Sequence, residues 1–275
     1  MSVIKVNNIT NRDGTSGPVI AGITTVSSTS HMVVPTGSTG QRVALAPDPY
    51  INNLVLALPF NSESVFTDVS PKRQGDPFIA GITTTASLPF GVTGVTTTSV
   101  GITTFSKYYG NSVYFNGTSG NYISFPDNPD FEFASEDYTV EFWCNPSRSV
   151  SYEEIVSKGL PWQLYRDGAG TFSLAASADN GTYWTNASIG TGSAGQWHHI
   201  AVSRKGSTTY GFVNGVSGLT TSSFPIYDGT SSLVIGSYAP DLASYPYRGY
   251  IQDLRIYKGV AKYTSNFTPP NQIAL

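Results

Sequence analysis

Residues 138–144 read Tyr-Thr-Val-Glu-Phe-Trp-Cys, with a large apolar or aromatic side chain at every second position. In an extended strand, successive side chains point to opposite faces of the sheet. One face of this strand therefore carries Tyr138, Val140, Phe142 and Cys144. We expect this face to enter a core between two sheets, with Cys144 as a buried and unreactive thiol. The intervening residues, including Glu141, face the other way.

Turn signals recur along the chain between short segments rich in β-forming residues. Asn-Gly or Asp-Gly pairs occur at 116–117, 167–168, 180–181, 214–215 and 228–229. Such pairs tolerate the positive φ angles that two-residue hairpins require. Because no segment shows a convincing helical period, the sequence predicts an all-β fold, a two-sheet antiparallel sandwich. The apolar run at 53–60 suits a strand buried on both faces and is predicted to begin this sandwich.

The composition excludes several classes of function. Charged residues make up 12% of the 275 residues and the net charge is −3, so the chain has no basic field for a phosphate backbone. Nucleic acid is therefore not an expected partner. One cysteine excludes a disulfide framework and multi-cysteine zinc sites. We find no apolar run of the ~18 residues that a membrane span needs, and no secretion signal at the N-terminus.

Residues 1–50 differ from the rest of the chain. They contain apolar patches but too few large side chains to build a core. Segments of this kind gain order by pairing with another chain or a neighbouring surface. We expect residues 1–50 to form an extended attachment or oligomerisation arm, the alternative being a flexible leader, and residues 51–275 to form the sandwich.

Three further stretches complete an ordered set of motifs. Residues 112–117 read Ser-Val-Tyr-Phe-Asn-Gly, residues 196–200 read Gln-Trp-His-His-Ile, and residues 249–257 read Gly-Tyr-Ile-Gln-Asp-Leu-Arg-Ile-Tyr. Together with Glu-Phe-Trp at 141–143, they resemble the laminin-G-like, concanavalin-A-like jelly-roll family over about residues 53–270. The tail at 257–270 is similar to the version in structural proteins of tailed phages, particularly phages of marine cyanobacteria. The resemblance implies a jelly roll that contacts glycans or proteins and often holds calcium.

Calcium binds six to eight oxygen ligands. The candidate oxygen donors near the predicted turns are Asn116, Asn121, Asp127, Asp130 and Asp253. Asp-rich turns that cap strands are the alternative reading. The sequence departs from the family at Gln252, where many relatives carry Asp beside the residue that matches Asp253. No metal ligand is therefore assigned.

Catalytic patterns are missing from the sequence. His198 and His199 are neighbours on a predicted strand and point to opposite faces, so they cannot hold one ion in the usual way. Glu153 and Glu154 diverge for the same reason, whereas glycosidases need two carboxyl groups about 5–9 Å apart. Nucleophile elbows and phosphate-binding loops do not occur either. We expect no catalytic residues and no enzymatic activity.

Aromatic residues beside predicted turns are the candidate ligand contacts. Rings with polar tips suit sugar faces or protein surfaces, and packing onto sheet edges is the alternative. The candidates are Tyr183, Trp184, Tyr238, Tyr245 and Tyr247.

The resemblance predicts a non-enzymatic structural protein of a tailed-phage virion, either a tail-fibre or appendage part or a head decoration. Residues 1–50 would bind other virion proteins. We also expect a homo-oligomer, with a trimer favoured, because virion appendages commonly share the symmetry of the site to which they attach. The jelly roll would face glycans or proteins of the host surface. The alternatives are a free carbohydrate-binding lectin of a bacterium and, less favoured, a sandwich-fold glycoside hydrolase.

Overall fold

The computed structural model describes residues 33–36, 41–44, 48–58, 60, 78–80, 101–108, 111–149, 152–179, 181, 184–222, 224 and 226–270. The chain divides into two compact units, Met1–Pro47 and Asp48–Leu275. In the first unit, strands β1 (Val33–Thr36) and β2 (Gln41–Ala44) pair in antiparallel fashion. The other residues of the predicted arm lie outside the described residues, except Asp48 to Tyr50, which belong to the second unit.

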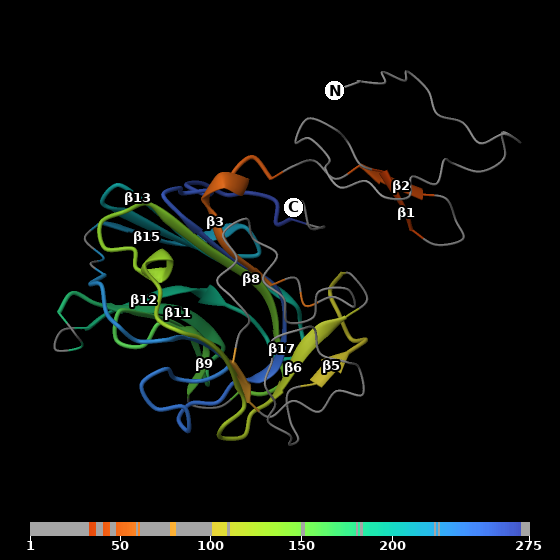
Figure 1. Ribbon diagram of the computed structural model, residues 1–275, viewed down its shortest axis with the longest axis horizontal. Helices are drawn as coiled ribbons and strands as arrows, with labels where there is room; N and C mark the ends of the chain where they lie inside the picture. Colours follow the sequence, from red (N-terminus) through yellow and green to blue (C-terminus); the bar gives the residue numbers. More distant parts are fainter. Residues whose placement is uncertain are drawn as a thin grey trace, which may run out of the picture. The chain divides into compact units, whose positions relative to one another are not determined.

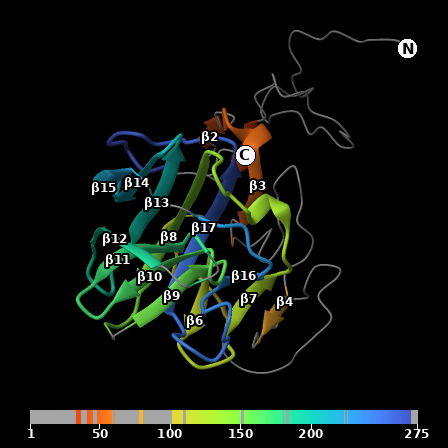
Figure 2. The same cartoon turned by 90° about the vertical axis from the view of Figure 1, so that its left-hand side faces the viewer.

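The second unit is a sandwich of two antiparallel sheets (Figures 1 and 2). In the described part of the chain, the seven-stranded sheet has the order β12 (Trp184–Thr191), β11 (Thr171–Ser177), β10 (Trp162–Asp167), β9 (Tyr152–Ser157), β16 (Leu233–Ile235), β7 (Tyr122–Phe125) and β4 (Phe78–Ala80). The eight-stranded assembly joins β15 (Val216–Ser222), β14 (Thr208–Val213), β13 (His198–Lys205), β8 (Tyr138–Pro146), β17 (Arg248–Lys258), β6 (Ser112–Asn116) and β5 (Gly101–Thr103), with β3 (Leu54–Leu58) paired to β17. In the described residues, short 3-10 turns occupy Ile51–Asn53 and Pro129–Phe131. The predicted all-β two-sheet sandwich is confirmed.

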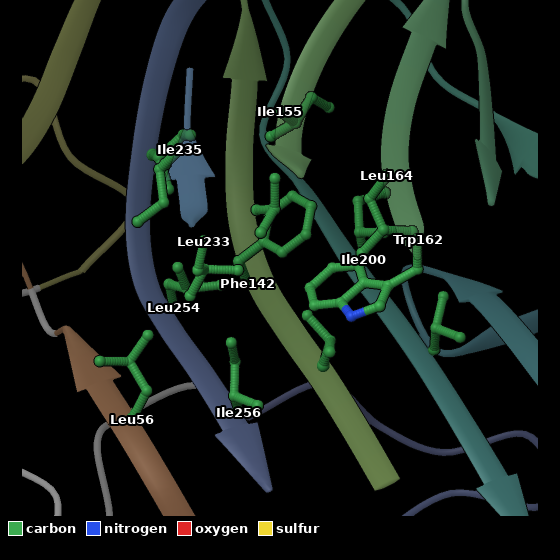
Figure 3. Packing of buried hydrophobic residues seen from close by; sticks show 14 of the residues in the cluster. Leu56, Phe142, Ile155, Trp162, Leu164, Ile200, Leu233, Ile235, Leu254 and Ile256 are labelled. Atoms are coloured by element: carbon green, nitrogen blue, oxygen red, sulfur yellow. The ribbon is translucent and has the colours of Figure 1, made fainter. Parts of the chain in front are cut away.

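The core lies between the two sheets, where the alternation on β8 places it. The four residues predicted to face inward are at most 2% exposed and belong to one apolar cluster: Tyr138, Val140, Phe142 and Cys144. Figure 3 shows Phe142 and Ile200 near Trp162 and Leu164 from the opposite sheet. The strand predicted at 53–60 is observed as β3, and all of its residues are buried. Burial of this kind removes apolar surface from water and supplies most of the stabilisation.

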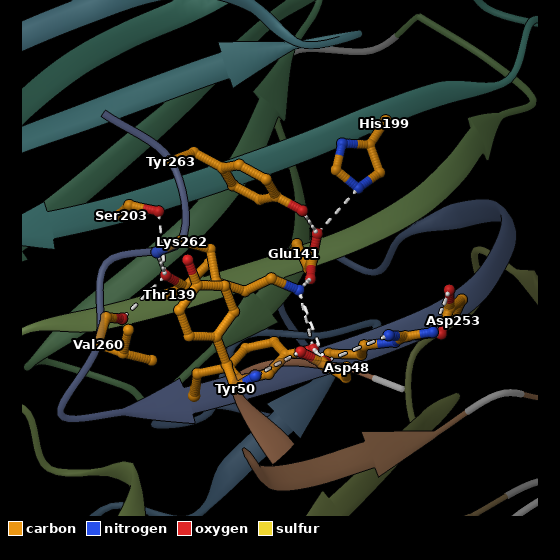
Figure 4. A network of polar contacts seen from close by, with 12 residues as sticks. Asp48, Tyr50, Thr139, Glu141, His199, Ser203, Asp253, Val260, Lys262 and Tyr263 are labelled. Atoms are coloured by element: carbon orange, nitrogen blue, oxygen red, sulfur yellow. Dashed lines mark hydrogen bonds and ion pairs between the residues drawn. The ribbon is translucent and has the colours of Figure 1, made fainter. Parts of the chain in front are cut away.

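The outer face of β8 is buried as well, which strand alternation alone does not show. The segment 259–267 after β17 crosses this face (Figure 4). Thr139 Oγ1 donates to Val260 O at 3.0 Å, and Lys262 Nζ lies 2.5 Å from Glu141 Oε1. Tyr263 donates its hydroxyl to Glu141 Oε2 at 2.7 Å. Burial opposes ionisation of Glu141, but Lys262 and His199 outweigh it and hold its pKa below the ordinary value.

The turn between β14 and β15 confirms the hairpin signal at 214–215. Asn214 and Gly215 both have positive φ, 53° and 76°, as a two-residue hairpin of the primed type requires. The turn also receives the chain end, because Phe267 N donates to Gly215 O at 2.9 Å. A Cβ on Gly215 would lie 1.9 Å from Phe267 O, so only glycine permits this approach.

Candidate functional site

A cleft lies on the outer face of the seven-stranded sheet. Alternation on β9 and β10 builds it, because Ile155 and Leu164 point into the core while their neighbours Glu154 and Tyr165 point outward. The cleft has a volume of about 290 Å³. The described residues that line it are Tyr152, Glu154, Gln163, Tyr165, Ala175, Trp184, Asn186, Tyr238 and Tyr245.

Three of the five aromatic residues predicted from the sequence meet in this cleft. Trp184 comes from the start of β12, while Tyr238 and Tyr245 come from the loop between β16 and β17. Residues from separate parts of the sequence thus converge on one site. Tyr183 lies outside the described residues.

The prediction that Tyr247 contacts a ligand is wrong. Its side chain is 0% exposed and belongs to the core between the sheets. Its ring lies 6.0 Å from that of Phe115, and its backbone N donates to Gly236 O at 2.9 Å. Tyr245 and Tyr247 are two residues apart, but Tyr245 has a φ of 53°, so the chain bends between them and regular alternation does not apply.

The tyrosines of the cleft form a continuous row of rings. Tyr165 and Tyr152 stack with centroids 4.6 Å apart and planes at 17°. Tyr152 lies 5.6 Å from Tyr245, and Tyr245 lies 5.8 Å from Tyr238. Tyr152 is 41% exposed and Tyr245 49%, so both rings offer surface to a ligand. A row of contacting rings that is partly exposed is typical of a binding surface.

Glu154 is the acidic group of the cleft. Its side chain is buried, at 2% exposure, and its Oε2 has no hydrogen-bond partner among the described residues. Its backbone N donates to Tyr245 O at 2.9 Å, which ties β9 to the loop that carries two of the tyrosines. Burial raises the pKa of Glu154 from 4.5 to about 8. A carboxyl group that is protonated at neutral pH donates a hydrogen bond as well as accepting one.

In the sequence, Glu154 is conspicuous only as the neighbour of Glu153. The two carboxyl groups do diverge: Glu153 Oε1 accepts from Arg148 Nε at 2.8 Å and from Arg248 N at 3.1 Å, away from the cleft. Glu154 could have been found from the pattern Tyr-x-Glu at 152–154, which places an aromatic ring and a carboxyl group on one strand face. The pattern Gln-x-Tyr at 163–165 likewise places a polar side chain and an aromatic ring on one face of the next strand.

A larger cleft of about 600 Å³ lies beside the turn between β10 and β11. Arg166 and His198 line it, together with small residues. The Arg166 guanidinium already donates to Arg148 O at 3.0 Å and to Gly192 O at 2.9 Å. We therefore assign Arg166 a structural role and take the aromatic cleft as the candidate site.

The two neighbouring histidines point to opposite faces, as predicted. His198 lies 5.6 Å from Phe172 of the other sheet, and its Nε2 is 2.9 Å from Ser193 O. His199 lies on the outer face, with Nε2 3.3 Å from Glu141 Oε2. They cannot hold one ion together.

Two of the five candidate calcium donors, Asp127 and Asp253, pair with cationic side chains. Asp253 pairs with Arg255 through Nε at 2.8 Å, and Asp127 pairs with the Lys158 ammonium at 2.5 Å. Gln252, where the family often has Asp, both accepts from Tyr108 N and donates to Tyr108 O, each at 2.9 Å. A carboxylate could not donate in this way. Among the described residues, no group of three or more His, Cys, Asp or Glu could hold a metal ion.

No helix in the described part of the chain is long and apolar enough to cross a membrane.

Comparison with solved structures finds a similar sandwich in domains of several other proteins. Domain 4 of the GH43 extracellular arabinanase AbnA from Geobacillus stearothermophilus, solved with arabinotriose, has a TM-score of 0.57 and 21% identity over 76% of this chain and 94% of that one. The binding domain of Paraclostridial Mosquitocidal Protein 1 has a TM-score of 0.59 and 15% identity over 78% of this chain and 50% of that one. The ligand binding domain of botulinum neurotoxin serotype D, solved with N-acetylneuraminic acid, has a TM-score of 0.54 and 14% identity over 78% and 49%. This chain thus spans about half the length of the two toxin domains.

No curated protein matches the sequence. A family model described as the Concanavalin A-like lectin/glucanases superfamily, Laminin_G_3, matches residues 116–262, which is more than half of the chain. That span contains strands from both sheets and all nine described residues that line the aromatic cleft. By sequence and by fold, the chain belongs to the concanavalin A-like lectin/glucanase superfamily.

Proposed function

We propose that this chain is a non-enzymatic glycan-binding protein that holds its ligand in the aromatic cleft, and that a tailed-phage particle displays it to the host surface. The observation that carries the glycan-binding part is the make-up of the cleft. Five aromatic residues surround three groups that form hydrogen bonds, Glu154, Gln163 and Asn186. Sugars offer apolar C–H faces and a rim of hydroxyl groups, so rings beside amide and carboxyl groups complement both surfaces.

The size of the cleft sets the size of the ligand. Its volume of about 290 Å³ corresponds to the lower end of small-molecule sites, which span about 300–1,000 Å³. Such a cleft suits one or two sugar units of a longer glycan. The arabinanase domain solved with arabinotriose shares only the fold with this chain, and the proposal therefore depends on the cleft itself.

The lining supports binding rather than hydrolysis. Glycoside hydrolysis needs two carboxyl groups on either side of the scissile bond. Among the described residues of the cleft, Glu154 is the one that carries a carboxyl group, and Glu153 points to the other side of the sheet. A free bacterial lectin with the same cleft is the alternative, and a sandwich-fold glycoside hydrolase is less favoured.

The virion part of the proposal follows from the resemblance of residues 257–270 to phage structural proteins. Residues 1–50 would attach the protein to other virion proteins and to sister subunits. Mass spectrometry of purified phage particles tests this part. We expect the protein in stoichiometric copies, and its absence from the particles would favour the free lectin.

Binding measurements on the full chain test the cleft. We expect Trp184→Ala to weaken glycan binding by about tenfold or more, because it removes a stacking surface. The matched control is Phe105→Ala, which removes a ring that is 47% exposed but does not line the cleft. Glycan array screening followed by calorimetry gives the affinities. Equal loss in both variants, or none in either, would contradict the assignment of the cleft.

A further inference from the structure

The charged groups around the aromatic cleft are acidic. Glu154 lines it, and among the described lining residues none is Lys or Arg. Asp167 lies close enough to Tyr152, and Asp241 close enough to Tyr238, to act electrostatically on those two hydroxyl groups. The carboxylates of Asp167 and Asp241 give the cleft a negative potential even while Glu154 is protonated, and this potential repels anionic ligands and attracts cations. The cleft is therefore poorly suited to an acidic sugar such as N-acetylneuraminic acid, which the similar neurotoxin domain holds.

Glu154 needs a partner that the described residues do not supply. Its side chain is 2% exposed, no ion pair joins it to Lys, Arg or His in the described part of the chain, and Oε2 has no hydrogen-bond partner there. A buried carboxyl group in this state stays protonated, and burial raises the pKa of Glu154 to about 8. A cation within hydrogen-bond distance would reverse this, since an opposite charge stabilises the ionised form.

The rings around Glu154 also favour a cation. Aromatic faces carry negative potential and attract ammonium groups, most strongly where water is displaced. Tyr165, Tyr152, Tyr245 and Tyr238 form a continuous row of rings with neighbouring centroids 4.6 to 5.8 Å apart. Clusters of aromatic rings are a known arrangement for binding ammonium ligands, and here such a cluster lies beside one buried carboxyl group.

We propose that the sugar unit selected by this cleft carries a positively charged amino group, which pairs with the Glu154 carboxylate between the rings. This inference rests on the proposed glycan-binding function and names the class of glycan, an amino sugar without an N-acetyl group. When the ammonium form binds, Glu154 releases its proton to the solvent; when the free amine binds, Glu154 gives its proton to the amine. In both cases the buried pair has zero net charge, so the cost of burying each charge is offset by the other.

Calorimetry with a matched pair of ligands tests this inference. The probes are the tetramers of glucosamine and of N-acetylglucosamine, which differ in the amino group, titrated into the full chain at physiological salt. We expect the glucosamine tetramer to bind at least about tenfold more tightly, as hydrogen bonds to charged groups are worth about that factor or more. Glu154→Gln should remove that advantage and change the affinity for the N-acetylated tetramer less than about twofold.

A control variant separates the pairing from general attraction between a polycation and an acidic protein. Asp228→Asn removes an exposed carboxylate that does not line the cleft, and both affinities should stay unchanged. Equal binding of the two tetramers, or equal loss of both in Glu154→Gln, would overturn the amino-sugar inference. Thermal melting of Glu154→Gln checks that the variant is folded.

The outcomes also distinguish this inference from the function on which it rests. If both tetramers bind equally and Trp184→Ala abolishes binding, the assignment of the cleft as a glycan site is supported and only the amino-group inference is rejected. If neither tetramer nor any other glycan binds, both fall. Tight binding of a trimethyl-lysine peptide without binding of either tetramer would likewise overturn both, and would assign the cleft to a protein partner.

Discussion

Glu154 should make the stability of the protein depend on pH. Burial raises its pKa from 4.5 to about 8, so between these values the folded state holds a proton that the unfolded state has lost. By linkage, its contribution is most favourable below about pH 4.5 and is lost as the pH rises to about 8. Since one pKa unit corresponds to about 1.4 kcal/mol, the upper bound of the loss is about 5 kcal/mol.

Glu154→Gln isolates this effect, because Gln has the same shape and does not titrate. We expect the variant to gain stability relative to the wild type as the pH rises from about 4.5 to 8, and to show no further gain above it. Urea unfolding at a series of pH values measures the difference. A difference that is the same at every pH would show that the pKa of Glu154 is not raised in the folded protein.

Cys144 should be unreactive in the native protein. Its side chain lies in the core at 0% exposure, and burial raises the pKa of the thiol well above its ordinary value. Because the thiolate is the reactive form, a disulfide reagent such as DTNB should label the native protein far more slowly than the unfolded one. The unfolded chain should react with one equivalent of DTNB per molecule, since it has one cysteine. Rapid labelling of the native protein would contradict the packing of β8.

Individual residues could be predicted from the sequence where regular alternation holds. It placed Phe142 and Cys144 in the core, and it separated Glu153 from Glu154. Tyr247 was grouped with Tyr245 only as an aromatic residue beside a predicted turn, and it lies in the core instead, because Tyr245 has a left-handed backbone and the chain changes direction there. The role of Glu154 depends on Tyr238 and Tyr245 lying over β9, a contact between distant parts of the sequence that no local pattern encodes.

A buried cluster of charged residues holds the segment that follows β17 against the sheet. Lys262 Nζ lies 2.5 Å from Glu141 Oε1 and 3.8 Å from Asp48 Oδ2, all on the outer face of β8 and β17. We expect Lys262→Met to lower the free energy of unfolding by about 3 kcal/mol, because it leaves the Glu141 carboxylate buried without its nearest cation. Urea unfolding gives the value.

Two further variants qualify this result. Lys205→Met removes an exposed lysine and should change stability by no more than about 0.5 kcal/mol. The double variant Glu141→Gln and Lys262→Met should recover part of the loss, since no unpaired charge is left. If the double variant were as unstable as the sum of the two single changes, the pair would not be coupled.

The strands were easier to predict from the sequence than the segments that pack over their outer faces. The apolar run at 53–60 was recognisable as a strand buried on both faces, and β3 is buried throughout. The alternating pattern of β8 indicated only one buried face. The segment that covers the other face has no regular structure, and its contacts to Thr139 and Glu141 span more than a hundred residues of sequence. Hydrogen bonds of this kind have no periodic signal.

The whole molecule consists of two units, and the second contains a complete core of its own. The apolar cluster between the sheets lies within Asp48–Leu275, and Asp48 itself binds the Tyr257 hydroxyl at 2.5 Å. We therefore expect a chain of residues 48–275 to fold by itself, with a melting temperature within about 2 °C of the full chain and unchanged binding in the cleft. Circular dichroism and calorimetry measure both.

The same truncation tests the role proposed for the first unit. If residues 1–50 hold sister subunits together, the full chain should sediment as an oligomer and residues 48–275 as a monomer. Display of several clefts on one oligomer would then raise the apparent affinity for a multivalent glycan surface, and the truncated protein should lose this gain while it keeps its affinity for a single oligosaccharide. Sedimentation equilibrium and binding to immobilised glycan separate the two effects. A truncated protein that still sediments as an oligomer would place the subunit contacts in the sandwich, and a full chain that sediments as a monomer would remove the oligomerisation role from the arm.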